Sequence, residues 1–107
     1  MNAEIKFQKV CNLEDVWEGE MDVFDVGDNE VLIVHAPGGE VRAFHPSCPH
    51  QEHPLVDGDF ENCILTCNAH LWQFNVISGE GTNPTGTALT SYPVKTENEE
   101  IWVSFPD

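Results

Sequence analysis

Short hydrophobic runs recur along the whole chain of 107 residues, and Gly, Pro or Asn separates most of them. The runs are rich in β-branched and aromatic residues, which is typical of strands. Tight turns are expected at Asp28-Asn29, at Pro37-Gly38-Gly39 and at Asn98, because these residues tolerate a positive φ or fix a turn. We expect strands over residues 4–10, 20–26, 31–35, 40–45, 63–66, 71–75, 89–94 and 101–105.

One short segment, residues 12–17, has the features of a helix start. Asn12 is a candidate cap, and Asp15 stands three residues later, where its side chain can reach back to the cap. The segment is too short to organise a fold. The sequence therefore predicts an all-β protein, a small antiparallel sandwich or barrel, and its length suits a single domain over residues 1–107.

The stretch from residue 46 to residue 58 interrupts the strand pattern with Pro, His, Gln, Glu and Asp. Loops of this length in a small domain usually have a function. We therefore expect a functional loop here.

The chain is strongly acidic, with 19 acidic residues against four basic ones and a formal net charge of −15. Nucleic acid and anionic membranes are poor partners for it, since both are negatively charged. Residues 14–30 hold many carboxylates and no cation, which favours brief encounters with basic partner surfaces. Residues 1–10 lack the long apolar core of a signal peptide or a membrane span, so we expect a cytoplasmic protein.

Two Cys-His pairs are the strongest motif in the sequence. Cys48-Pro49-His50 is followed, after sixteen intervening residues, by Cys67-Asn68-Ala69-His70. A reducing cytosol disfavours disulfides, so clustered Cys and His point to a metal, and two thiolates with two imidazoles form a soft ligand set. We expect Cys48, His50, Cys67 and His70 to be the ligands. The other candidates, Cys11, Cys63, His35 and His45, are expected to be ordinary packed or surface residues.

Two kinds of metal centre suit this set of ligands. A tetrahedral structural zinc in a binding domain is one, because two Cys and two His are a standard zinc set. Zinc modules commonly use a Cys pair and then a His pair, however, whereas each loop here contributes one Cys and one His. The mixed distribution favours a binuclear centre in which each loop gives its Cys to one iron and its His to the other.

The two boxes, Cys48-Pro49-His50 and Cys67-Asn68-Ala69-His70, resemble the ligand boxes of Rieske iron–sulfur proteins. The resemblance extends over nearly the whole chain and includes a third, Pro-bearing loop at Gly81-Thr82-Asn83-Pro84. It implies one Rieske-type 2Fe–2S cluster held by Cys48, His50, Cys67 and His70. It also implies a cluster-binding subdomain at about residues 45–76, formed by the two ligand loops.

The sequence around the boxes, at residues 48–52 and 69–75, is similar to the sequences of ferredoxins of multicomponent aromatic monooxygenases of the toluene type. This resemblance implies a monomeric one-electron carrier, not an enzyme, between an NAD(P)H-dependent flavin reductase and a di-iron hydroxylase. A ferredoxin of a ring-hydroxylating dioxygenase is the alternative. Those ferredoxins more often carry Trp-His-Gly at the second box, where this chain has Ala69-His70-Leu71.

The resemblance also implies a low-potential cluster. Respiratory Rieske proteins have a disulfide between the ligand loops, at positions that match His53 and Ala69, and sulfur-bonding hydroxyls at positions that match Trp72 and Phe74. None of these groups is present here. Core packing suits Trp72 better than a role in electron relay. The residues near the boxes that are expected to touch partners or shield the cluster are Gln51, Glu52, His53, Leu71, Trp72 and Pro84.

Overall fold

The computed structural model describes residues 7–36, 38–47, 55–61, 63–67, 73–77, 81–83 and 89–105. Every strand pairing among them is antiparallel, which confirms the all-β prediction. Two single-turn 3-10 helices accompany the strands, η1 (Leu13–Asp15) and η2 (Leu55–Asp57). No helix of the described residues is long and apolar enough to cross a membrane.

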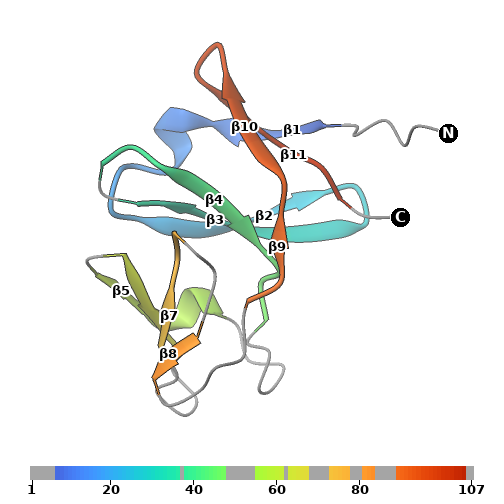
Figure 1. Cartoon of the computed structure of the whole chain (residues 1–107). Helices are drawn as coiled ribbons and strands as arrows, with labels where there is room; N and C mark the ends of the chain where they lie inside the picture. Colours follow the sequence, from blue (N-terminus) through green and yellow to red (C-terminus); the bar gives the residue numbers. More distant parts are fainter. Residues whose placement is uncertain are drawn as a thin grey trace, which may run out of the picture.

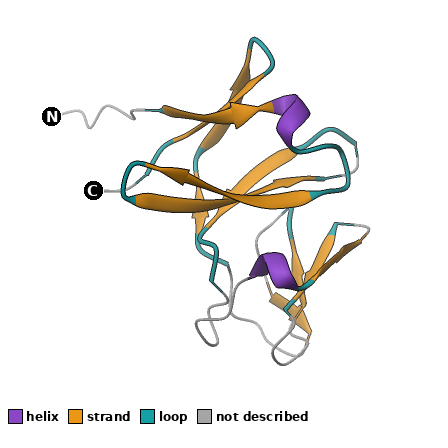
Figure 2. Cartoon of the chain, turned by 180° about the vertical axis from the view of Figure 1, so that it is seen from behind, coloured by secondary structure: helices purple, strands orange, loops and turns teal. Residues whose placement is uncertain are grey.

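The strands form three sheets, whose orders are β1-β11-β10, β2-β3-β4-β9 and β5-β6-β7-β8. The first two sheets pack together, and the third, here called the small sheet, lies at one end of the molecule (Figures 1 and 2). The strands are β1 (Gln8–Asn12), β2 (Met21–Val26), β3 (Asn29–His35), β4 (Val41–Phe44), β5 (Asp59–Glu61), β6 (Ile64–Thr66), β7 (Gln73–Asn75), β8 (Gly81–Asn83), β9 (Ser91–Tyr92), β10 (Val94–Glu97) and β11 (Glu100–Val103).

Strand β3 lies between the two hydrophobic cores and contributes side chains to both. Val31 and Ile33 face the core between the first two sheets, whereas Leu32 and Val34 face the core under the small sheet, and all four side chains are fully buried. A strand covered on both faces has a continuous hydrophobic run in its sequence, which is why residues 31–34 do not alternate. The small sheet is thus fixed to the rest of the protein by packing on β3.

The turns agree with the sequence except at one hairpin. Val26 pairs with Asn29, so the β2–β3 turn consists of Gly27 and Asp28, one residue earlier than predicted. Gly27 has a φ of 62°, and a two-residue hairpin that needs a positive φ at its first central position selects glycine there. The turn at Gly38-Gly39 and the turn at Asn98 lie where the sequence predicts them.

Several strand boundaries differ from the prediction. β5 and β8 were not predicted, because each has three mostly polar residues and no hydrophobic run marks either of them. The segment predicted as one strand over 89–94 is divided into β9 and β10 at Pro93, which has no backbone N–H to donate. The loop predicted over 46–58 includes η2 at its end. The predicted short helix is η1, and the backbone N–H of Asn12 donates to Asp15 Oδ2 at 2.9 Å.

Candidate metal centre

Of the four predicted ligands, Cys67 belongs to the described part of the chain. Cys48, His50 and His70 lie outside the described residues, and so do the predicted contact residues Gln51, Glu52, His53, Leu71, Trp72 and Pro84. The described residues that flank both boxes nevertheless define where each ligand loop begins and ends.

Cys67 follows β6 directly and continues its alternation toward the core. Leu65 is fully buried and Cys67 is 1% exposed, whereas the alternate residues Ile64 and Thr66 are half-buried. Residues two positions apart on a strand share a face, so Leu65 and Cys67 enter the same core. The Cys67 thiol forms no disulfide. It therefore stands as a shielded sulfur at the end of a paired strand.

The second ligand box is the connection between β6 and β7. Thr66 pairs with Gln73 and Leu65 pairs with Phe74, so both ends of residues 67–72 are held by the small sheet. Phe74 is fully buried in the core that Cys67 enters. The register of this strand pair thus decides which side of the sheet receives the Cys67 sulfur.

The first ligand box lies within a loop that is closed at its base. The backbone N–H of Leu55 donates to the carbonyl of Pro46 at 2.9 Å, which joins the described residues on the two sides of the box. Leu55 is fully buried in the same core as Cys67. The residue that follows the first box and the residue that opens the second therefore share one apolar core. Leu55 is a supporting residue that the sequence analysis missed, although an apolar Leu-Val pair inside a polar loop was a usable signal.

The residues present fit a 2Fe–2S cluster with two Cys and two His ligands. Such a cluster needs thiolates screened from water and imidazoles at the other iron, and Cys67 supplies a sulfur beside the buried side chains of Leu55, Leu65 and Phe74. Leu55, which follows the first box, and Cys67, which opens the second, both lie in this core. Within the described residues themselves, no group of three or more Cys, His, Asp or Glu side chains could hold a metal.

The remaining cysteines lie outside the two ligand boxes, Cys11 in the other core and Cys63 against the core that Cys67 enters. Cys11, on β1, is buried in the core between the first two sheets, and burial, followed by the nearby carboxylates of Asp15 and Asp22, raises the pKa of its thiol to about 11. Cys63 was predicted within a strand, but it occupies the β5–β6 turn with a φ of 66° and is half-buried. A two-residue hairpin turn requires a positive φ, which explains why the strand starts one residue later.

The two described histidines bond to nearby backbone groups. His35 Nδ1 lies 2.9 Å from the carbonyl oxygen of Val16, which ties β3 to the segment after η1. His45 Nδ1 accepts a hydrogen bond from the backbone N–H of Ser47 at 3.2 Å. Both imidazoles therefore have local structural contacts.

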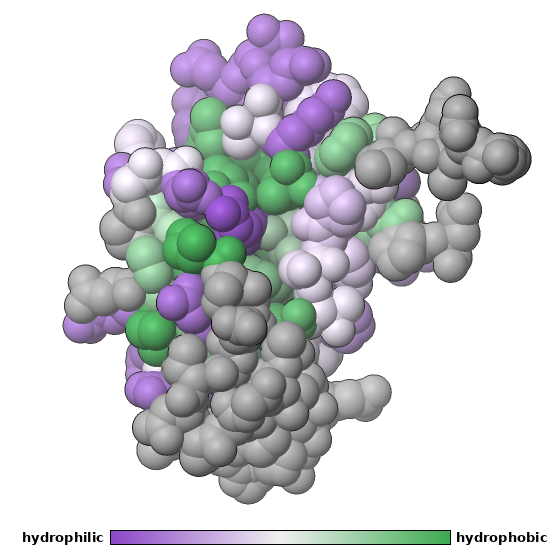
Figure 3. Space-filling model, viewed as in Figure 1, coloured by the Kyte–Doolittle hydropathy of each residue, from purple (hydrophilic) through white to green (hydrophobic). Residues whose placement is uncertain are grey.

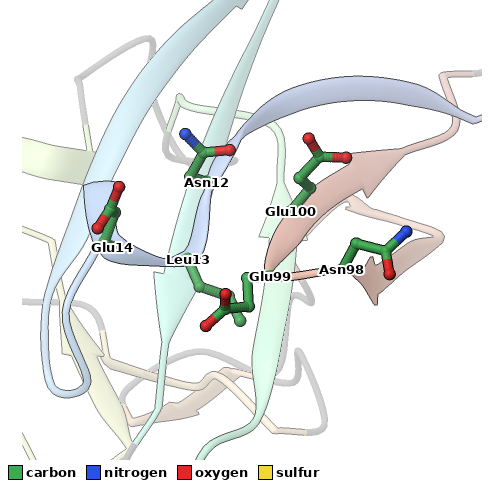
Figure 4. Close-up of a pocket in the computed structure, with 6 residues that line it drawn as sticks. All are labelled: Asn12, Leu13, Glu14, Asn98, Glu99 and Glu100. Atoms are coloured by element: carbon green, nitrogen blue, oxygen red, sulfur yellow. The ribbon is translucent and has the colours of Figure 1, made fainter.

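A hollow of about 280 Å³ lies between η1 and the β10–β11 hairpin, on the opposite side of the molecule from the small sheet (Figures 1 and 4). The backbone N–H of Leu13 donates to the carbonyl of Glu99 at 2.9 Å beside it. None of its lining residues belongs to the small sheet or to a ligand box. The hollow is lined by Asn12, Leu13, Glu14, Asn98, Glu99 and Glu100.

Known proteins resemble the chain in sequence and in fold. It is 45% identical to the ferredoxin component of an alkene monooxygenase system from Xanthobacter autotrophicus, over 95% of this chain and 86% of that protein. It is 37% identical to the methanesulfonate monooxygenase ferredoxin subunit of Methylosulfonomonas methylovora, over 86% of this chain and 75% of the relative. The solved ferredoxin of carbazole 1,9a-dioxygenase from Nocardioides aromaticivorans superposes with a TM-score of 0.81, at 30% identity, over 92% and 96% of the two chains.

The family model that matches describes a Rieske [2Fe-2S] domain, and it covers residues 6–93. The match takes in both ligand boxes and the small sheet between and after them. It confirms the resemblance that the two Cys-His pairs indicated. It also favours the binuclear iron centre over a structural zinc, because the centre of this family is a 2Fe–2S cluster. Matched over most of its length, and with relatives of nearly the same extent, the chain belongs to the Rieske [2Fe-2S] family and carries one Rieske-type 2Fe–2S cluster.

Proposed function

We propose that this Rieske electron carrier takes electrons from an NAD(P)H-dependent flavin reductase and delivers them to the di-iron hydroxylase of a monooxygenase system. The 45% identity to the ferredoxin component of an alkene monooxygenase system, over nearly the full length of both proteins, carries the proposal. We also propose that the protein works in the cytoplasm as a monomer. The hydroxylase, and not the ferredoxin, selects the substrate. That the substrate is an aromatic hydrocarbon, as the sequence around the ligand boxes implies, stays a prediction.

We assign the cluster ligands to Cys48, His50, Cys67 and His70. When bound, the cluster takes up and releases one electron without forming a bond to a substrate. The chain holds the Cys67 sulfur at the end of β6 and screens it from water with the apolar core. Leu55 and Phe74 support the two loops from below, so the ligands are held before a partner arrives. We place the proposed cluster-binding subdomain at about residues 45–76.

The charge of the described surface supports docking to basic partners. Each described cation already has an acidic neighbour: Lys9 pairs with Glu100 at 2.9 Å, Lys95 with Glu97 at 3.9 Å, and Arg42 with Glu40. The excess of carboxylates over the whole chain is therefore uncompensated. A negative surface of this kind speeds encounter with a positive one, and salt weakens the effect.

A dioxygenase system is the second candidate. The fold and the 30% identity shared with the ferredoxin of carbazole 1,9a-dioxygenase favour it, because that protein serves an oxygenase of another class. The identity is lower than that to the monooxygenase ferredoxin. We therefore rank the di-iron hydroxylase first.

A reconstituted electron-transfer assay tests the proposal. The purified holoprotein is combined with NADH, a flavin reductase, and either the hydroxylase of the Xanthobacter alkene monooxygenase or the oxygenase of carbazole 1,9a-dioxygenase. We expect oxygenated product with the hydroxylase, none without the ferredoxin, and much less with the dioxygenase. Cys67→Ser should abolish product, whereas Cys63→Ser, its matched control, should retain it. Product formed only with the dioxygenase would overturn the assignment to a monooxygenase.

A further inference from the structure

The outer face of the small sheet carries a hollow of about 610 Å³, which we call the acidic hollow. Its residues come from β5, β6 and β7. The face opposite to it is the buried one, with Leu65 and Phe74. Hydrophobic and hydrophilic surface lie side by side at the lower left of Figure 3, where β5 lies in Figure 1. The acidic hollow is lined by Asp59, Phe60, Glu61, Ile64, Thr66 and Gln73.

The strand register places two carboxylates along one edge of this face. Asp59 pairs with Thr66 and Glu61 pairs with Ile64, and directly paired residues project from the same side of a sheet. Both acidic residues are exposed, and Ile64 and Thr66 are half-buried. The acidic hollow therefore has an acidic edge and a partly apolar floor.

The charges of this face are not neutralised within the part of the chain that the structure describes. The described cations Lys9, Arg42 and Lys95 lie on β1, β4 and β10, in the other two sheets, and each has its own acidic partner. Neither Asp59 nor Glu61 forms an ion pair with a described residue. A partner that brings lysine or arginine to this face would therefore meet unopposed negative charge.

The acidic hollow also lies next to the metal centre. Thr66, which lines it, immediately precedes the ligand Cys67, and Gln73 closes the same ligand loop through its pairing with Thr66. A partner seated on this face would touch the strands that hold the second ligand box.

We propose that the acidic hollow seats a surface segment of the oxygenase component that carries lysine or arginine, and so orients the cluster toward it. The inference rests on the proposed function. The long aliphatic stem of such a side chain would lie over Ile64, while its charged end meets Asp59 or Glu61. An arginine would form two hydrogen bonds to one carboxylate, which fixes direction as well as affinity.

Charge reversal at two sites, with equal net charge, tests the proposal. One variant combines Asp59→Lys and Glu61→Lys. The control combines Asp25→Lys and Glu30→Lys, an exposed pair of facing carboxylates at the β2–β3 hairpin, on the other side of the molecule from β5 (Figure 1). Reduced holoprotein is mixed with the oxidised hydroxylase of the Xanthobacter alkene monooxygenase in a stopped-flow instrument, at low ionic strength. The visible spectrum of each variant checks that the cluster is intact.

We expect the hollow variant to lose at least about tenfold in the second-order rate of electron transfer, with a flatter salt dependence, and the control to stay within about threefold of wild type. Equal losses in both variants would overturn the inference, because total charge would then explain them. A loss confined to the control would also overturn it. If wild-type protein passes no electrons to the hydroxylase, the proposed function fails as well, so the two failures are distinguishable.

Discussion

Leu65 on β6 lies directly opposite Phe74 on β7, and both side chains are fully buried in the core that Cys67 enters. A shift of this register by one residue would turn Leu65 and Cys67 to the outer face. The pair therefore directs the sulfur of Cys67, a proposed cluster ligand, toward the core in addition to packing it.

Leu65→Ala should lower the free energy of unfolding by about 2–4 kcal/mol, because it removes buried methyl groups and leaves a cavity beneath the ligand loop. The variant should also release iron faster on dilution. Chemical denaturation followed by circular dichroism gives the stability. Ile64→Ala, the half-buried neighbour on the other face, is the control and should cost less. Equal costs at the two sites would contradict the packing role given to Leu65.

Stability should fall as the pH rises from about 9 toward 11, in part because of Cys11. Its folded-state pKa is raised to about 11 by burial, so the native thiol keeps its proton where the unfolded thiol has lost it. The contribution is complete below the unfolded pKa and disappears as the pH reaches the folded one. Burial raises the pKa of Tyr92 as well, so wild type must be compared with Cys11→Ser at each pH. A difference between the two proteins that does not change over this range would refute the assignment.

The strand pattern and the two Cys-His pairs made the all-β class and the family predictable from the sequence. The loop base was harder to predict. The bond from the Leu55 N–H to the Pro46 carbonyl joins residues with no periodic relation, and no hydrophobic run marks β5. The β2–β3 turn lies one residue earlier than the predicted Asp28-Asn29. Its first central position has a positive φ, which favours glycine, and Gly27 occupies that position.

The reduction potential should be near the lower end of the range for Rieske clusters, about −150 mV. The chain lacks the loop disulfide and has Trp72 and Phe74 where high-potential relatives carry hydroxyl donors. A hydrogen bond to a charged acceptor is worth about 1.5–3 kcal/mol, so one donor shifts a one-electron couple by up to about 60–130 mV. Voltammetry measures the potential directly, and a value above about +100 mV would refute the prediction.

Phe74→Tyr tests the cause of that low potential. The new hydroxyl should raise the potential when it donates to the Cys48 sulfur. Phe74 is fully buried, so the added oxygen must displace neighbouring atoms, and we expect a loss of about 1–3 kcal/mol in stability. An unchanged potential, with the hydrogen bond visible in a crystal structure, would show that sulfur donors do not set it.

Electron transfer with the reductase and the hydroxylase should slow as ionic strength rises. The net charge of −15 attracts basic partner surfaces over about 10 Å at 0.1 M salt, and added salt shortens that range. Stopped-flow rates from about 0.02 to 0.5 M sodium chloride measure the effect. Rates that do not change with salt would rule out electrostatic steering.

The four ligands can be tested by substitution. Replacing any of Cys48, His50, Cys67 or His70 with Ala should abolish or convert the cluster. Cys11→Ser and Cys63→Ser should retain two irons and two acid-labile sulfides per chain, because Cys11 lies in the other core and Cys63 in the β5–β6 turn, both outside the ligand boxes. A folded Cys11 or Cys63 variant without a cluster would overturn the ligand assignment.

Pulsed electron paramagnetic resonance of the reduced holoprotein, grown with ¹⁵N-histidine, tests the ligand set most directly. Two histidine nitrogens bound to one iron should give two strong nitrogen couplings in the wild type, and changing His50 or His70 to Ala should remove one of them or the signal itself. The result predicted here is two such couplings on a centre of two irons. A centre without histidine coupling, or a colourless protein that holds zinc, would contradict it.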